Sequence, residues 1–196
     1  MAGHIARWKA EHANYRKLLD LLDAQVRIFS SGGQPDYDLM ANTVYYLTRD
    51  PDRSHSSRED AAFSRLVGCL PQLGELIDEL VRQSLSIKRM GGVLAAYLAA
   101  LAHGATVSRT ALIGDVRRYV RNRRDHMDKE ERELFPQLAV SLTDRDWFLV
   151  DSATHFNSDL RLEESAHAHL GAIRQKIADA MGCSCESTPT DSCCVN

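Results

Sequence analysis

Apolar residues along this 196-residue chain recur at alternating spacings of three and four, which is the period of an amphipathic helix. One stripe of apolar positions runs from Trp8 to Phe29. A later stripe runs from Leu73 to Leu101 and has Ser84 as a polar member. The strict alternation of a half-buried β-strand is found nowhere in the chain. The pattern therefore predicts an all-α protein.

Glycine and proline residues mark the ends of the predicted helices. The first helix ends at a Gly-Gly pair followed by Pro35, and a second helix is expected from about Asp36. Pro51 interrupts the second helix, because the residue before a proline disfavours helical backbone, and the helix resumes near Ser54. Pro71 fits the first turn of a third long helix.

The remainder of the chain predicts a fourth long helix and further helices after it. The fourth helix is expected over about residues 106–140. Thr143, with Asp146 three residues later, is a typical N-cap pair, so another helix begins there. A final amphipathic helix is expected over residues 159–181. Four long helices with short connections predict an antiparallel four-helix bundle with additional C-terminal helices.

The composition is that of one globular domain. The chain is 44% hydrophobic and 26% charged, with a formal net charge of −3, and we expect one domain over residues 1–181. A slightly acidic chain has no general attraction for nucleic acid. No apolar run approaches the roughly 20 residues of a membrane span, and the N-terminus does not resemble a secretory signal. We therefore expect a cytoplasmic protein without a membrane or nucleic-acid partner.

Four of the five cysteines crowd into the last fourteen residues, at Cys183, Cys185, Cys193 and Cys194. With only Cys69 elsewhere, a disulfide framework for the fold is not expected. Residues 182–196 are predicted to form a Cys-rich, disordered tail. The alternative is that these thiols bind a soft metal or act as a redox pair.

A short motif occurs twice: His55 is followed by Glu59, and His126 by Glu130. On a helix, residues four apart share a face with Cβ atoms roughly 6 Å apart, so each pair can bind one ion together. Imidazole with carboxylate suits iron, zinc or manganese. His12 lies in the first apolar stripe and adds a third imidazole. A solvated His–Glu pair would need no metal, and that alternative stays open.

Two glutamates on inward-facing stripes require a compensating positive charge. Burying an ionised carboxylate is costly unless it is paired or binds a metal. The same stripes offer one cationic side chain, Arg123, whereas a dication would supply the charge directly. Asp60 and Glu131 are candidates to orient ligand histidines, or else are solvated surface acids.

These residues resemble a known family. The chain is similar to the hemerythrin-like, HHE cation-binding proteins over most of residues 8–150. The resemblance rests on Glu11-His12, Tyr46 to Phe63, His126 to Pro136, Leu142-Thr143 and Asp146-Trp147. It implies a four-helix protein that holds a pair of non-haem irons among its helices.

The resemblance implies five metal ligands in this chain, which are His12, His55, Glu59, His126 and Glu130. The family takes a further histidine from the third helix, where this chain has Ser84. Because a protonated hydroxyl is a poor ligand, we expect one tight and one weaker, more open metal position, or a mononuclear site. One or two iron ions are expected, with zinc or manganese as substitutes.

The resemblance also implies a function. Members of this family bind or sense O₂ or iron, or handle NO or peroxide, so we expect a metal-binding protein whose partner is a small diatomic or peroxide ligand. One alternative is a metalloenzyme that consumes peroxide or NO. Another is a degenerate, metal-free bundle that serves as an interaction module.

Overall fold

The computed structural model describes residues 2–51, 57–153, 171–173 and 175–180. These residues form helices and turns and contain no β-strand, which confirms the all-α prediction. The α-helices are α1 (Ala2–Ser30), α2 (Tyr37–Pro51), α3 (Ser57–Cys69), α4 (Gly74–Ala102), α5 (Arg109–Lys129), α6 (Phe135–Ser141) and α7 (Asp144–Ala153). A 3-10 turn (Pro71–Leu73) precedes α4, and a π-helix (Glu130–Leu134) joins α5 to α6.

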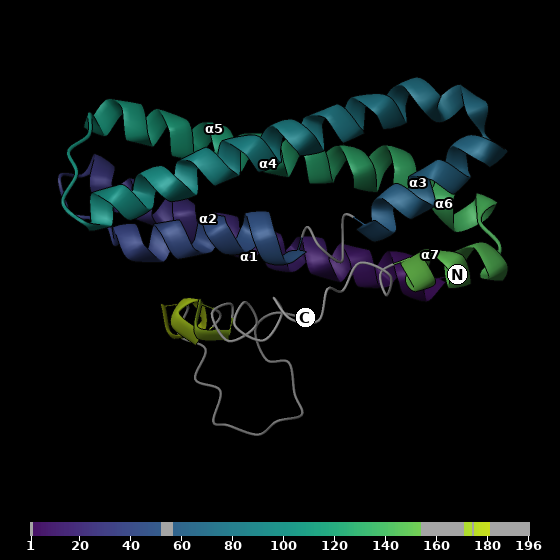
Figure 1. Cartoon of the computed structure of the whole chain (residues 1–196), viewed down its shortest axis with the longest axis horizontal. Coiled ribbons are helices and arrows are strands. Elements are labelled where there is room, and N and C mark those ends of the chain that lie inside the picture. The colour runs from purple at the N-terminus through teal and green to yellow at the C-terminus, as the bar shows by residue number, and fades with distance from the viewer. Residues whose placement is uncertain (1, 52–56, 154–170, 174, 181–196) are drawn as a thin grey trace.

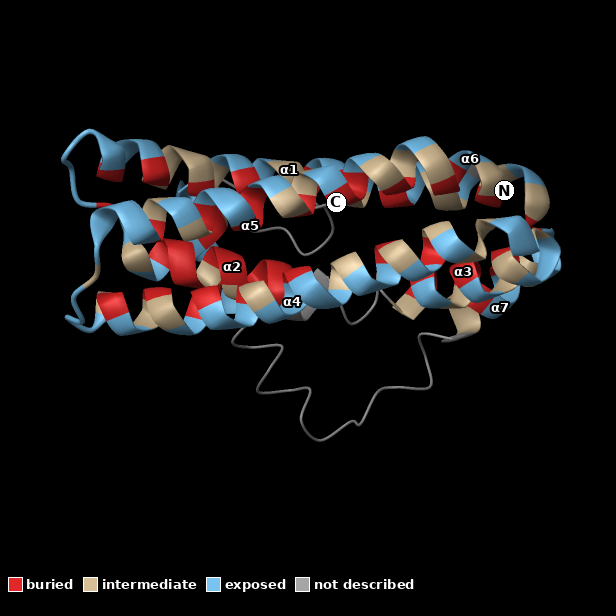
Figure 2. Cartoon of the chain, turned by 90° about the horizontal axis from the view of Figure 1, so that it is seen from above, coloured by how far each residue is buried: buried red, intermediate tan, exposed pale blue. Residues whose placement is uncertain are grey.

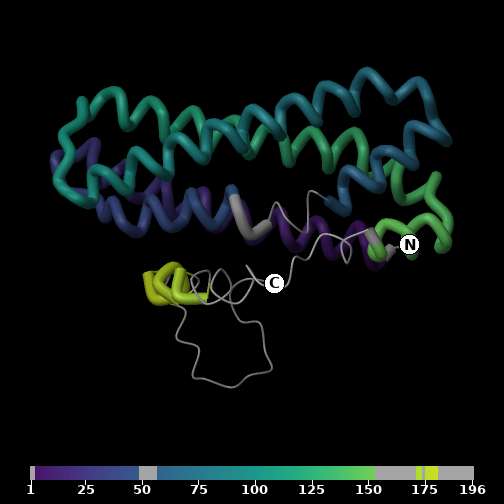
Figure 3. Tube along the Cα trace, in the orientation of Figure 1, coloured from purple at the N-terminus to yellow at the C-terminus, as the bar shows by residue number. Residues whose placement is uncertain are grey.

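The long helices lie side by side along one axis. α1, the α2–α3 pair, α4 and α5 alternate in direction along this axis (Figure 1). α2 and α3 follow one another along this axis (Figure 3). α2 packs mainly on α4, and α1 packs mainly on α5. The short helices α6 and α7 lie at one end of the molecule, where they pack against α3.

The buried faces of the helices point toward one another (Figure 2), and the apolar core between them has two parts. The larger cluster joins α1, α2, α4 and α5 through residues such as Leu19 and Leu98. The smaller cluster lies at the end where α6 and α7 pack, and includes Trp8, Phe135 and Trp147. The core is therefore divided along its length.

Helix ends follow the predicted breaks closely. Asp36 caps α2, because its carboxylate accepts a hydrogen bond of 2.8 Å from the backbone N–H three residues later. Thr143 and Asp146 form the predicted capping box at α7: each backbone N–H donates to the other's side chain, at 3.0 and 3.3 Å. Pro71 opens the 3-10 turn ahead of α4.

The prediction of one unbroken α-helix over residues 106–140 is wrong, because the helix changes type at Glu130. α5 begins after Ser108, whose hydroxyl accepts a hydrogen bond from the Ala111 N–H at 3.5 Å. At Glu130 the α-helical hydrogen bonding gives way to a π-helix, which adds one residue to a turn. The apolar period predicted an unbroken α-helix there.

α4 corrects a second expectation. The segment Pro71–Ala102 is long and apolar enough to cross a membrane, by length and composition alone. The prediction that no run approaches this length was too strong. A core helix passes the same test, and α4 packs against α2 and α5 through buried residues such as Ile87 and Leu94.

Part of the predicted final helix falls within the described residues. Residues 171–173 and 175–180 are helical, and Ile173 and Ile177 are buried in the larger cluster, as their apolar stripe predicts. The other positions of that predicted helix and the predicted tail, 182–196, lie outside the described residues.

Candidate metal centre

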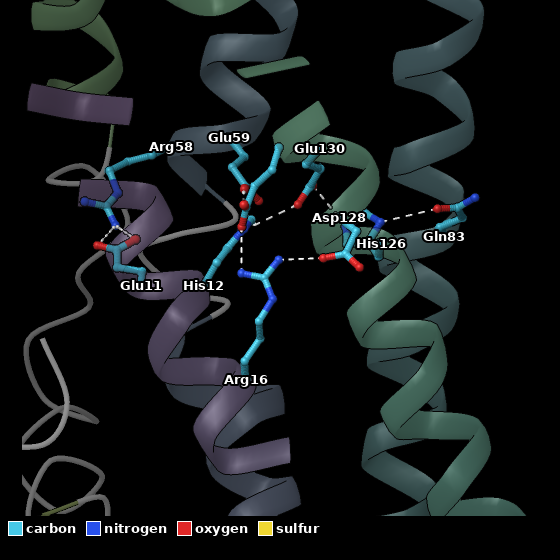
Figure 4. Close-up of polar contacts among 10 residues, drawn as sticks. Glu11, His12, Arg16, Arg58, Glu59, Gln83, His126, Asp128 and Glu130 are labelled. Atoms are coloured by element: carbon cyan, nitrogen blue, oxygen red, sulfur yellow. Dashed lines mark hydrogen bonds and ion pairs between the residues drawn. The ribbon is translucent and has the colours of Figure 1, made fainter. Parts of the chain in front are cut away.

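A layer of polar side chains separates the two apolar clusters. His12 on α1, for example, lies between Trp8 of the smaller cluster and Tyr15 of the larger. α3, α4 and the end of α5 carry polar residues in the same interval. The residues of this polar layer are His12, Glu59, Gln83, Ser84, His126 and Glu130, and Figure 4 shows five of them labelled.

Three predicted ligands converge at the centre of the layer. His12 Nε2 lies 3.6 Å from Glu130 Oε2 and 3.9 Å from Glu59 Oε1. The ligand atoms of all three residues lie within 4.8 Å of one another, and all three side chains are buried. These separations are too long for hydrogen bonds, but they suit ligands arranged around one ion at roughly 2.0–2.2 Å each.

His126 joins this group through Glu130. Its Nε2 lies 3.0 Å from Glu130 Oε1, so the two oxygens of one carboxylate face two imidazoles from different helices. His126 lies in the last turn of α5, and Glu130, four residues later, is the first residue of the π-helix. The remaining predicted ligand, His55, lies outside the described residues.

The π-helix brings a second acid to His12. A π-helical turn contains one more residue than an α-helical turn, and here the Phe135 N–H donates to the Glu130 carbonyl, five residues back. Glu130 and Glu131, although adjacent, both reach His12: Glu130 faces Nε2, and Glu131 Oε1 lies 2.9 Å from Nδ1. Two consecutive carboxylates therefore face the two nitrogens of one imidazole, and Glu131 is the one within hydrogen-bond distance.

Glu131 is held in its ionised form. The hydrogen bond from His12, followed by that from Arg16, lowers the pKa of Glu131 to about 2. Arg16 Nη1 donates to Glu131 at 2.8 Å, and its Nη2 donates to Asp128 at 2.6 Å. A carboxylate can only accept, so His12 Nδ1 carries the proton and Nε2 is directed at Glu130 and Glu59. The sequence offered Asp60 and Glu131 as candidates to orient a ligand histidine, and Glu131 contacts His12 Nδ1 in the structure.

His126 has a neutral partner. Its Nδ1 lies 3.4 Å from Gln83 Oε1, and the Gln83 amide in turn donates to Glu79 at 2.8 Å. Lys129 Nζ contacts the other oxygen of Glu79 at 2.6 Å. This chain of contacts turns the Gln83 oxygen toward His126 (Figure 4). Ser84, the residue expected from sequence at the third-helix position, is half-buried beside Gln83.

Sequence reasoning missed Arg16, Gln83 and the buried Arg58. Arg58 is 3% exposed and donates from Nη2 to both oxygens of Glu11, at 2.9 and 3.0 Å. Helical spacing could have indicated two of these three residues, because residues one turn apart on a helix are neighbours. Arg16 is one turn after His12, and Gln83 is one turn after Glu79. None of the spacings pointed to Arg58.

Aromatic residues line the layer on either side. The Phe135 ring centroid lies 5.3 Å from that of His12, and Tyr15 lies on the other side at 6.3 Å. Burial, reinforced by the negative charge of Glu11, raises the pKa of Tyr15 above its ordinary value, so its phenol is neutral. The buried Arg123 lies over the Tyr15 ring, 5.6 Å from its centroid.

Comparison with known proteins gives one match. The family model of the hemerythrin HHE cation binding domain matches residues 3–138, which is more than half of the chain. No curated protein and no solved structure matches the chain. The matched span contains every residue of the polar layer and also His55.

Proposed function

Because the chain belongs to the hemerythrin HHE cation-binding family, we propose that its polar layer binds one or two non-haem iron ions and, through them, O₂, NO or a peroxide. The observation that carries this proposal is the buried group of His12, Glu59 and Glu130, whose ligand atoms lie within 4.8 Å of one another. Buried carboxylates at this spacing are stabilised by a dication.

The proposed scaffold is an antiparallel four-helix bundle made of α1, the α2–α3 pair, α4 and α5. The alternating direction of these helices supports it. Each of the four presents a polar residue to the same layer, as metal sites inside helical bundles require.

The proposed ligand set is asymmetric. We place the tighter metal position between His12 and His126, because both imidazoles face the Glu130 carboxylate. The weaker position lies on the side of His55 and Glu59, where α4 offers Ser84 in place of an imidazole. Iron bound in this layer supplies an open coordination position at which a small ligand can bind.

The surrounding side chains suit a small, weakly polar ligand. Phe135 lies against the His12 ring, and Trp8 packs on Phe135 with ring centroids 5.6 Å apart, so this side of the layer is closed to bulk water. Tyr15 keeps its proton because of burial, so its hydroxyl can donate a hydrogen bond but adds no negative charge to the layer.

The decisive experiment measures the metal content of protein purified without chelators, for the wild type and for His126→Ala. We expect iron in the wild type and a clear loss in the variant. His103→Ala is the matched control, because His103 is exposed beyond the end of α4 and contacts the Ala99 carbonyl at 2.7 Å. An iron-free wild type with the same thermal stability as His126→Ala would overturn the proposal.

Ligand binding and turnover are separated on the iron-loaded protein. Reversible spectral changes with O₂ or NO support a binding role, whereas stopped-flow loss of peroxide that depends on iron identifies a metalloenzyme. An absence of both reactions in a protein that holds iron would contradict the O₂, NO or peroxide part of the proposal.

A further inference from the structure

A polar pocket of about 540 Å³ opens between α4 and α5, on the flank of the bundle. α4 contributes Gln83, Ser86 and Ile87 to its lining, and α5 contributes residues that include Asn122 and Asp125. The pocket is not part of the polar layer, but it shares Gln83 with it.

Gln83 connects the pocket with the candidate metal centre. Its side-chain oxygen lies 3.4 Å from His126 Nδ1, and His126 Nε2 lies 3.0 Å from Glu130. The path from the pocket to Glu130 therefore passes Gln83 and His126. A separation of 3.4 Å is at the long end of hydrogen-bond distances, so the contact between them is weak. The Gln83 side chain is also held by its hydrogen bond to Glu79 at 2.8 Å, so it moves aside only when that bond is released.

The charges around the pocket leave one carboxylate uncompensated. Three of its charged lining residues have ion-pair partners close by: Asp128 with Arg16 at 2.6 Å, Lys129 with Glu79 at 2.6 Å, and Arg132 with Glu133 at 2.7 Å. The exposed Asp125 forms no ion pair with any residue in the described part of the chain. Asp125 is therefore the charged lining residue that has no ion-pair partner among the described residues.

The remaining polar lining groups are hard oxygen donors. Gln83 and Asn122 offer amide oxygens, Ser86 offers a hydroxyl, and Asp125 offers a carboxylate. Oxygen donors of this kind exchange easily with the water shell of a divalent cation and bind it only loosely. A pocket with this lining can admit a hydrated cation without retaining it.

We propose that this pocket is the entry route by which a hydrated divalent metal ion reaches the centre. The ion collects at Asp125, passes the Gln83 side chain as it moves aside, and is delivered to the His126–Glu130 pair. The inference rests on the proposed function, since it names the path to the same centre.

The test measures the rate of Co²⁺ uptake by metal-free protein in a stopped-flow instrument, from the visible absorption of the bound ion. Asp125→Asn is expected to slow uptake by about threefold or more at low ionic strength, because it removes a negative charge that attracts a dication to the pocket. Ser86→Trp fills the pocket and is expected to slow uptake further. In both variants the amount of Co²⁺ bound at equilibrium stays as in the wild type.

Two matched controls separate the pocket from general effects. Asp115→Asn removes the same charge from α5 at a position that lines a different pocket, and Ala96→Trp adds the same bulk to α4 in the groove facing α2. Both variants are expected to take up Co²⁺ at the wild-type rate. Circular dichroism confirms that each variant is folded before it is measured.

The outcomes distinguish this inference from the proposal beneath it. A wild type that binds no Co²⁺, Fe²⁺ or Zn²⁺ overturns the proposed function itself. A wild type that binds the ion, with Asp125→Asn and Ser86→Trp loading at the same rate as their controls, overturns the entry route alone.

Discussion

His12 and His126 face the same Glu130 carboxylate, yet they are held in different ways. His12 is 1% exposed, and its Nδ1 contacts an ionised carboxylate at 2.9 Å that is itself paired with Arg16. His126 is 9% exposed, and its Nδ1 faces the neutral amide of Gln83 at 3.4 Å. A charged acceptor makes an imidazole a better ligand and fixes its orientation, and a neutral, distant acceptor does so less.

The difference separates a rigid side of the centre from an adaptable one. On the α1 side, the charged network of Glu131, Arg16 and Asp128 links α1 to α5 and holds His12 in place. On the α4 side, Gln83 is shared with a pocket, and Ser84 offers no imidazole. We expect the first side to fix the position of the metal and the second to admit ions and ligands.

The largest effect is expected from Glu130→Gln, which removes the carboxylate that both histidines face. The side-chain volume is retained while the charge is lost, so we expect metal binding to disappear on both sides of the centre. Metal content after loading with Fe²⁺ is the measurement. Glu133→Gln, in the same π-helix and paired with Arg132, is the control and should bind metal as the wild type does.

Glu131→Gln tests the charged side of the comparison. Loss of a group that orients a metal-binding histidine costs about 10- to 100-fold in metal affinity, so affinity should fall by this amount while stoichiometry is kept. Titration with Zn²⁺ against a competing chelator measures the change. An unchanged affinity would show that the contact of Glu131 with His12 does not support binding.

Gln83→Leu tests the neutral side and is expected to have a smaller effect. A neutral hydrogen bond contributes about 0.5–1.5 kcal/mol, which corresponds to a loss of metal affinity of roughly tenfold at most. The same chelator competition measures it, with Ser86→Ala as a control from the same helix. A loss larger than that of Glu131→Gln would reverse the assignment of the rigid and adaptable sides.

The smallest effect concerns the pH dependence of stability in metal-free protein. The pKa of Glu131 is lowered to about 2 by His12 and Arg16. The stabilisation from its ionised form is fully present above the ordinary glutamate pKa of about 4.3, and it is lost as the pH falls toward the folded-state value. Wild type should therefore exceed Glu131→Gln in stability at pH 6, and the gap should narrow by pH 3. Urea unfolding at each pH measures the gap, and a gap that widens on acidification would contradict the sign.

Much of the fold and the core of the site could be predicted from the sequence. The apolar period gave the long helices, because each buries one stripe of side chains. The same period placed His12, Glu59 and Glu130 on inward faces, and the structure brings these three together. The capping box at Thr143 was predicted because its residues act locally.

The partners of the histidines could not be predicted from the period. The spacing of apolar residues shows which face of a helix a residue occupies, and it placed Ser84 on the inward face of α4. Gln83, at the neighbouring position, nevertheless reaches His126 because its side chain is longer. The π-helix left no trace in the pattern, because Leu134 and Phe135 are both buried and fit either form of helix. Because the sequence did not reveal the π-helix, Glu131 could be predicted only as either a group that orients a ligand histidine or a solvated surface acid.

The π-helix also has a consequence for how sequences in this family can be compared. Its five residues occupy a segment in which an α-helical chain would need one residue fewer for the same advance around the axis. Winding all five residues as an ordinary α-helix would rotate everything beyond them by about 100° relative to α5. Phe135 and Leu138, both fully buried, would then leave the core. Deleting a single residue from Glu130–Leu134 would instead restore an ordinary helix and keep α6 in its present orientation. An alignment that opens a one-residue gap in this segment therefore implies an α6 seated as it is here and a histidine on α1 that has lost one of its two acids.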